Sequence, residues 1–260
     1  MIPVTEPEPP RTVAIPVAPG IRRMVANNPG RMTYWGTNTY IIDGPDGLVL
    51  LDPGPAGDAL HLSALLALGP ITDVLLSHGH SDHQGLLEPL LEQTEAKLHR
   101  FETLADGQEI AGWTALHTPG HATDHVCFAR DGVVFSADHV MGWSTTVISP
   151  PDGDMAAYFR SLERLIARTD TMFLPGHGPP ITEPQRFTRA MLLHRLSREA
   201  AIAARLMATP ITAGALTRAL YAGVSPTLWP AAERTVLAHL QKLEGEGRAR
   251  GVSEGWVAAG

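Results

Sequence analysis

The sequence contains one cysteine, Cys127, among 260 residues, so an intrachain disulfide is excluded and a reducing, cytoplasmic setting is expected. No apolar run approaches the roughly 20 residues that a membrane-spanning helix needs, so no membrane association is expected. The first residues, MIPVTEPEPPR, lack the basic start and apolar stretch of a signal peptide. A net charge of −7 provides no overall attraction to nucleic-acid backbones, which argues against tight binding of DNA or RNA.

Apolar residues make up 44% of the chain and charged residues 18%, the balance of a folded globular protein. Short apolar runs alternate with stretches of helical spacing up to about residue 181, and this alternation predicts a layered α/β fold. The predicted helices of this part are 58–69 and 154–170, and a predicted strand spans 71–78. Residues 85–100 are predicted to begin as a helix and continue as a strand, and residues 171–181 to form a strand followed by a loop.

After residue 190 the chain becomes rich in alanine, leucine and arginine. Helical stretches at 187–208, 212–223 and 230–247 precede two short strand-like pieces around a turn in RARGVSEGWVAAG. Two helices followed by a hairpin predict a winged-helix-like module. We therefore expect a catalytic domain over 1–195 and a winged-helix-like domain over 205–260.

The stretch LLSHGHSDHQG (75–85) places three imidazoles and a carboxylate within six positions: His78, His80, Asp82 and His83. A single histidine is usually a surface residue or a hydrogen-bonded core residue. The joint pattern His-x-His-x-Asp-His, however, has a chance of roughly one in a thousand in a chain of this composition. The cluster therefore indicates a metal site rather than an accident of composition.

Three later motifs place further metal-ligand types beside small residues, after predicted strands. They are TPGH ending at His121, FSAD ending at Asp138, and LPGHG containing His177. Glycine or another small residue beside each polar group permits tight turns and close approach of the backbone. These three residues are predicted to complete the site that the first cluster begins.

The donor set predicts two metal ions. His78 and His80 can converge on one ion with His121, whereas Asp82, His83 and His177 can hold a second. The two oxygens of Asp138 can bridge the pair, and two ions about 3.5–4 Å apart can hold a bridging hydroxide as nucleophile. Imidazole and carboxylate ligands predict Zn²⁺, with Mn²⁺ or Fe²⁺ as alternatives. Asp82 and Asp138 are the predicted catalytic carboxylates.

His-x-His-x-Asp-His at 78–83, followed by His121, Asp138 and His177, resembles the metallo-β-lactamase superfamily of hydrolases. GTNTYII (36–42), LLDPGP (50–55), TPGHATDH (118–125), FSADHV (135–140) and LPGHGPPI (174–181) are similar to its beta-lactamase-like protein two branch, which carries a C-terminal winged-helix-like domain. The resemblance implies an αββα sandwich with a dinuclear site at one edge of its two sheets. It also implies that the seven residues are all metal ligands.

The resemblance gives expectations for residues around the ligands as well. Asp52 matches a carboxylate that orients a ligand histidine, although a turn-forming aspartate before Pro53 explains the same position. His125 is a candidate proton donor to a leaving group, with helix capping or a solvated loop as the alternative. Asn38 and Tyr40 are expected to brace the backbone.

The expected reaction is hydrolysis of an ester, thioester, lactone or phosphodiester, with a small acyl compound or single-stranded RNA as substrate. A single-strand endoribonuclease is the alternative activity, because the branch includes one. A metal-sensing DNA-binding regulator is the non-enzyme alternative. Residues 210–260 hold five basic and four acidic side chains, so a lid or a homodimer contact is favoured over nucleic-acid binding for this module.

Overall fold

The structure, a computed structural model, describes residues 3–259. The chain forms two units. The first unit comprises residues 3–118, 124–145 and 168–187, and the second unit comprises residues 119–123, 146–167 and 188–259. The domain boundaries expected from the sequence, 1–195 and 205–260, are not decided by this grouping and stay a prediction.

A mixed sheet begins the first unit, with its strands paired in chain order. Its strands are β1 (Ile15–Ala18), β2 (Ile21–Val25), β3 (Asn38–Asp43), β4 (Leu48–Leu51), β5 (Ile71–Leu75) and β6 (Lys97–His99). The pairs from β1 to β4 are antiparallel, whereas β4, β5 and β6 run parallel. The last residues of β4 and β5 therefore lie at the same edge of the sheet.

A second sheet, in the order β11-β10-β9-β8-β7, completes the sheet pair of the first unit. Its strands are β7 (Glu109–Ile110), β8 (Trp113–His117), β9 (Val126–Arg130), β10 (Val133–Ala137) and β11 (Met172–Pro175). Only β10 and β11 pair in parallel among these strands. The ends of β10 and β11 therefore also share one edge.

Side chains that alternate along the strands build two cores in the first unit. Val49 and Leu51 of β4 join a cluster with Trp113 and Phe128, so this core lies between the two sheets. Leu48 and Leu50 of the same strand face the opposite way, into a cluster with residues of α1 and α3. Each buried leucine or valine contributes about 1.5–3 kcal/mol relative to an exposed one, so both faces of this sheet stabilise the fold.

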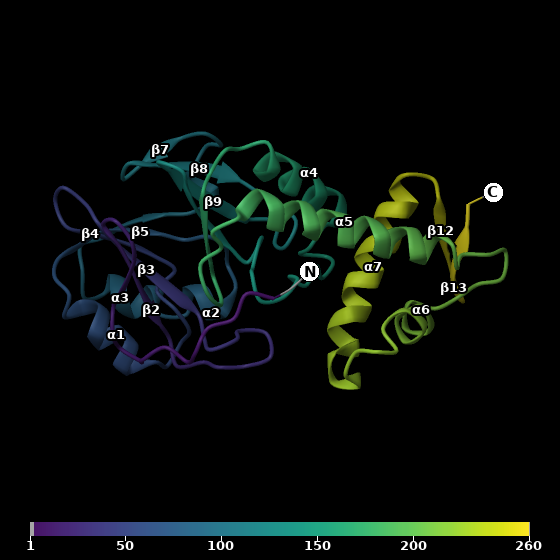
Figure 1. The fold of residues 1–260 in the computed structure, drawn as a ribbon, viewed down its shortest axis with the longest axis horizontal. Coiled ribbons are helices and arrows are strands. Elements are labelled where there is room, and N and C mark those ends of the chain that lie inside the picture. Colours follow the sequence, from purple (N-terminus) through teal and green to yellow (C-terminus); the bar gives the residue numbers. More distant parts are fainter. Residues whose placement is uncertain (1–2, 260) are drawn as a thin grey trace. The chain divides into compact units, whose positions relative to one another are not determined.

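Short helices flank the first sheet (Figure 1). They are α1 (Ala59–Leu66), α2 (Ser81–Gln84), α3 (Leu87–Leu91) and the 3₁₀ turn η1 (Phe101–Thr103). Asp58 caps α1 by accepting a hydrogen bond from the backbone N–H of His61 at 3.1 Å. The predicted helix at 58–69 is thus present and ends slightly earlier than expected.

The second unit is mainly helical (Figure 1). It contains α4 (Met155–Ile166), the larger part of α5 (Pro184–Ala203), α6 (Ala213–Leu220), η2 (Pro226–Leu228), α7 (Trp229–Gly245) and the hairpin of β12 (Ala249–Val252) and β13 (Gly255–Ala258). Leu216 of α6 packs with Val236 and Leu240 of α7 in one buried cluster. The predicted order of two helices and a hairpin is therefore present. Within residues 3–259, no helix is long and apolar enough to cross a membrane.

Candidate metal centre

Four strand ends of the first unit carry predicted site residues. Asp52 follows β4, His78 follows β5 by a short loop, Asp138 follows β10, and His177 follows β11 after Gly176. The two sheets meet where these ends converge: the N–H of Asn38 donates to the carbonyl oxygen of Gly176 at 2.8 Å. Residues distant in sequence thus lie together because parallel strands end at a common edge.

The first cluster continues into the short helix α2. His80 stands at the N-cap position with extended backbone angles, and Asp82 and His83 lie within the helix. His83 is fully buried, whereas the side chain of Asp82 keeps 29% of its surface exposed. The turn from extended to helical backbone lets residues two and three positions apart face one site.

Asp138 presents its two oxygens to two different histidines. Its Oδ1 lies 3.4 Å from Nε2 of His83, and its Oδ2 lies 3.4 Å from Nε2 of His177. Asp82 Oδ2 lies 3.2 Å from the same His177 nitrogen and 3.8 Å from Nε2 of His83. Both carboxylates therefore lie against His83 and His177, two of the ligands predicted for the second ion.

Two sets of ligand atoms in the first unit each lie within 4.8 Å of one another. One set is His78, His83 and Asp138, and the other is Asp82, His83 and His177. His80 joins the cluster through His78, because its Nδ1 lies 3.0 Å from Nε2 of His78. The structure thus brings six of the seven predicted ligands together.

His121, the seventh predicted ligand, belongs to the second unit. Its Nδ1 lies 2.9 Å from the carbonyl oxygen of Val147 and 2.9 Å from Oγ1 of Thr146. The carbonyl of Thr146 accepts a hydrogen bond from the buried guanidinium of Arg195. A backbone acceptor at Nδ1 directs Nε2 outward as the ligand atom, but the role of His121 on the first ion stays a prediction.

The electrostatics of the cluster favour positive charge on His83 and His177 and negative charge on Asp82 and Asp138. Burial acts to lower the pKa of His177, but the carboxylates of Asp138 and Asp82 together outweigh it and raise that pKa to about 9. Burial also opposes charge on Asp138, yet His177 and His83 hold its pKa well below the usual range. The pKa of His83 is raised well above its ordinary value, because Asp138 and Asp52 outweigh its burial.

Chemistry and spacing of these residues fit divalent cations. Nε2 of His83 is buried, and within residues 3–259 no hydrogen bond satisfies it, although two carboxylates face it. Gly176 keeps the centre open, since an added Cβ would meet Oδ1 of Asp138 at 2.5 Å and Cε1 of His83 at 2.6 Å. Imidazole and carboxylate donors around such a space are the ligand types that Zn²⁺, Mn²⁺ and Fe²⁺ take.

Asp52 supports the ligand cluster through hydrogen bonds with His83 and Ser77. Its Oδ2 accepts from Nδ1 of His83 at 2.8 Å, and its Oδ1 accepts from the backbone N–H of Ser77 at 2.8 Å. The backbone of Asp52 has φ 54°, a strained angle for a non-glycine residue. Thr39 supports this strained position by donating to the carbonyl oxygen of Asp52 at 2.7 Å. Of the two explanations for Asp52, orientation of a histidine is the one that these contacts support.

The other candidates lie around the same edge. Asn38 and Tyr40 both donate to the carbonyl oxygen of Pro175, at 2.8 and 2.7 Å, and so brace the loop before His177 as expected. His125 is fully buried rather than solvated, with Nδ1 3.0 Å from Oγ1 of Thr118. Its ring lies 5.2 Å from that of His78, measured between centroids. A proton-donor role for His125 stays a prediction.

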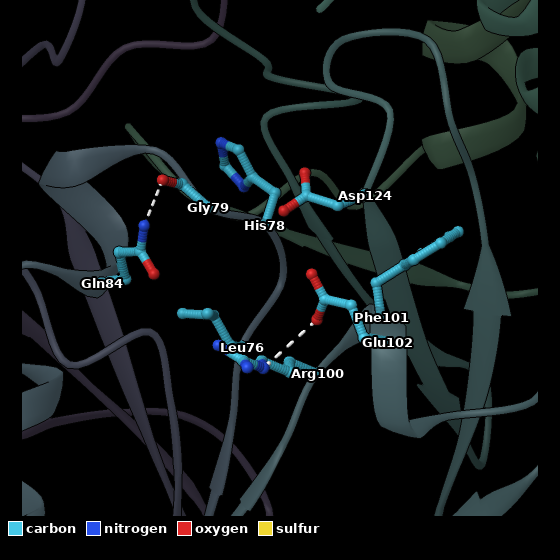
Figure 2. A pocket seen from close by; sticks show the side chains of 8 residues that line it. All are labelled: Leu76, His78, Gly79, Gln84, Arg100, Phe101, Glu102 and Asp124. Carbon is cyan, nitrogen blue, oxygen red and sulfur yellow. Dashed lines mark hydrogen bonds and ion pairs between the residues drawn. The ribbon is translucent and has the colours of Figure 1, made fainter.

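A small cavity of about 190 Å³ lies beside this edge (Figure 2). Its lining residues are Leu76, His78, Gly79, Gln84, Arg100, Phe101, Glu102 and Asp124. Figure 2 shows the carboxylates of Glu102 and Asp124 beside it, with Arg100 paired to Glu102 at 3.2 Å. The lining is largely polar, so the cavity suits water or a small polar group.

Sequence reasoning missed two residues that support the centre. Ser77 lies directly before the histidine motif and contacts both Asp52 and His78. Arg23, 4% exposed, donates to the carbonyl oxygen of Gly178 beside His177 and forms a two-fold ion pair with Glu6. Only the position of Ser77 in the motif could have suggested its role, whereas Arg23 carries no sequence signal of this kind.

Together, the fold and the donor set describe a two-sheet α/β protein whose cluster of histidines and carboxylates has the ligand types that divalent metals take. Models of two families match the chain: the metallo-beta-lactamase superfamily over residues 32–105 and 97–177, and the beta-lactamase associated winged helix domain over residues 212–256. The chain belongs to the metallo-β-lactamase superfamily, a family of hydrolases. The αββα fold class with a C-terminal winged helix, inferred from the motifs, is thereby confirmed.

Relatives of known name agree with this assignment. The chain is 31% identical to the Beta-lactamase-like protein 2 homolog of Drosophila melanogaster, over 88% of this chain and 89% of that protein. It is 27% identical to an Atrochrysone carboxyl ACP thioesterase of Cryptosporiopsis sp. (strain 8999), over 70% of this chain but only 62% of that protein. A metallo-beta-lactamase family protein from Thermus thermophilus shares the fold, with a TM-score of 0.79, 22% identity, and coverage of 93% of this chain and 99% of that structure.

Proposed function

We propose that the chain is a hydrolase with a dinuclear metal centre that cleaves a small ester, thioester or lactone. The observation that carries the proposal is the position of Asp138, which has a carboxylate oxygen within 4.8 Å of a ring nitrogen of His78 and its Oδ2 3.4 Å from Nε2 of His177. In this proposal Asp138 would be shared between two ions. His78, His80 and His121 would hold one ion, and Asp82, His83 and His177 would hold the other.

Two divalent ions, zinc in the first instance, would supply Lewis acidity and a nucleophile at neutral pH. The residues of the chain hold the geometry that this chemistry needs. Asp82 and Asp138 bring two negative charges that offset the charge of the ions, and Asp52 fixes the ring of His83 through Nδ1. Gly176 leaves the space between these side chains clear.

Small acyl substrates are favoured over RNA by two observations. One named relative is a thioesterase. In the second unit, two basic side chains of the winged-helix region are paired with carboxylates. Lys242 contacts Glu199 at 2.8 Å and Glu246 at 2.5 Å, and Arg248 contacts Glu246 at 2.9 Å. This pairing weakens the positive field that nucleic-acid recognition requires.

A substrate panel tests the proposal. The zinc-loaded and manganese-loaded protein would be assayed with an N-acetylcysteamine thioester, a homoserine-type lactone, bis(p-nitrophenyl) phosphate and an end-labelled single-stranded RNA. Asp138→Ala would be assayed alongside, with Asp46→Ala as control, because Asp46 is an exposed turn carboxylate outside the cluster. Metal content of each protein would be measured by mass spectrometry.

Thioester or lactone hydrolysis with two bound ions, lost together with one ion in Asp138→Ala and kept in Asp46→Ala, supports the proposal. Full activity in Asp138→Ala contradicts the dinuclear mechanism. RNA cleavage without acyl hydrolysis would instead identify an endoribonuclease, and a metal-loaded protein without any turnover would favour the regulator alternative.

A further inference from the structure

The hydroxyl of Ser77 lies between the carboxylate of Asp52 and the ring of His78. Ser77 Oγ is 2.6 Å from Oδ2 of Asp52 and 2.9 Å from Nδ1 of His78. All three residues are buried, with Ser77 fully so. No solvent therefore competes for this hydroxyl, and its bonds are decided by its two neighbours.

The direction of both hydrogen bonds follows from the number of protons available. A carboxylate offers only acceptor oxygens, and a serine hydroxyl has one hydrogen to donate. Ser77 therefore donates to Asp52, and its oxygen can only accept from Nδ1 of His78. This fixes the neutral ring of His78 as the tautomer with hydrogen on Nδ1 and a lone pair on Nε2, the nitrogen that lies 3.0 Å from Nδ1 of His80.

The same carboxylate oxygen orients the ring of a second histidine. Oδ2 of Asp52 also accepts from Nδ1 of His83 at 2.8 Å, which leaves Nε2 of His83 toward Asp138. Asp52 thus acts on His83 directly and on His78 through Ser77. Ring packing cannot replace this effect, because a ring contact fixes the plane of an imidazole and not the nitrogen that carries its hydrogen.

We propose that Ser77 is a positioning residue that selects the metal-binding tautomer of His78, so that one carboxylate, Asp52, prepares a ligand for each of two ions. The tautomer itself is a property of the metal-free protein. The consequence for metal affinity rests on the proposed function. The two parts therefore call for separate measurements.

The first measurement is long-range ¹H–¹⁵N NMR of the histidine rings in the metal-free full-length protein at pH 8. We expect wild type to show His78 as the Nδ1–H tautomer, assigned by comparison with His78→Gln. Ser77→Ala is expected to show a mixture of both tautomers, and Ser77→Thr, which keeps a hydroxyl, is expected to restore the wild-type pattern. Unchanged His78 signals in Ser77→Ala would overturn the proposal.

The second measurement is zinc titration against a competing chelator. Loss of a contact that orients a ligand typically costs 10–100-fold in metal affinity, so Ser77→Ala should bind one ion about 10–100-fold more weakly and Ser77→Thr should recover. Thr217→Val, which removes a buried hydroxyl from α6 in the second unit, is the matched control and should bind both ions normally. Equal affinities in wild type and Ser77→Ala would overturn the proposal.

Failure of the proposed function has a different signature. Wild type that binds no second ion contradicts the dinuclear centre, and the NMR result alone then decides the role of Ser77. The backbone N–H of Ser77 keeps its bond to Asp52 Oδ1 in the alanine variant, so the loop should fold. If Ser77→Ala does not fold, Ser77→Cys replaces it, because a thiol is a weak donor and should give the same mixture of tautomers.

Discussion

Substitution of Gly176 by alanine should disturb the metal centre while leaving the fold intact. A Cβ at this position would lie 2.5 Å from Oδ1 of Asp138 and 2.6 Å from Cε1 of His83. Ordinary van der Waals contact begins near 3.4 Å. Relief of both clashes therefore requires Asp138 and His83 each to move by about 0.8–0.9 Å, and well-packed surroundings resist such a move.

The consequence for metal binding should exceed the consequence for stability. Site residues must be held within about 0.5 Å of their working positions, so a shift of about 0.9 Å should remove most of the affinity for at least one ion. Overpacking a buried position costs about 1–3 kcal/mol, which a folded domain of ordinary stability survives. The backbone of Gly176 lies outside the left-handed region, so the expected effect is one of space alone.

Zinc content after dialysis, the absorption spectrum of the cobalt-loaded protein and urea unfolding would be measured on Gly176→Ala. The control is Gly223→Ala, because a Cβ there would meet nothing within 4 Å. We expect the first variant to lose at least one ion with an altered cobalt spectrum, and the control to match wild type. Two tightly bound ions and an unchanged spectrum in Gly176→Ala would refute the placement of Asp138 and His83.

Two further predictions concern stability. Burial lowers the pKa of His61 to about 4, so its folded form resists protonation while the unfolded form takes up a proton below about pH 6.5. The free energy of unfolding should therefore fall by about 2 kcal/mol between pH 7 and pH 5. Urea unfolding of metal-free His61→Gln should not show this part of the loss. Equal losses in wild type and His61→Gln would contradict the prediction. Arg23→Met should destabilise the chain by about 3 kcal/mol, because the part-buried carboxylate of Glu6 loses its partner. Adding Glu6→Gln should recover part of that loss in the same urea assay, and no recovery would contradict the ion-pair explanation.

The candidate metal ligands could be predicted from the sequence because they stand in short local motifs. His-x-His-x-Asp-His is visible within six positions, and His177 stands in a glycine-rich turn after an apolar run. That these side chains meet was inferred from the further ligand types that follow predicted strands, and the parallel pairs of β4 with β5 and of β10 with β11 bring such strand ends to common edges.

The supporting contacts could not be predicted in the same way. Ser77 and Asp52 are 25 positions apart, and Arg23 and Gly178 are 155 apart, so their contacts depend on sheet register and side-chain rotamers. The direction of a hydrogen bond is even harder to predict from the sequence, because it depends on all the neighbours around a hydroxyl. From residue type alone, Asp52 could either form a turn or orient a histidine. Only the contacts in the structure distinguish these two roles.

The centre thus depends on three properties that single substitutions can separate. The strand ends and Gly176 set where the ligand atoms lie, Ser77 with Asp52 sets which nitrogen of His78 offers a lone pair, and Arg23 stabilises the loop beside His177. Gly176→Ala should change the cobalt spectrum, because it moves ligands. Ser77→Ala should change the tautomer of one histidine in the metal-free protein, whereas Arg23→Met should change unfolding free energy first. If all three variants showed only a similar loss of stability, the separate roles of Gly176, Ser77 and Arg23 would be contradicted.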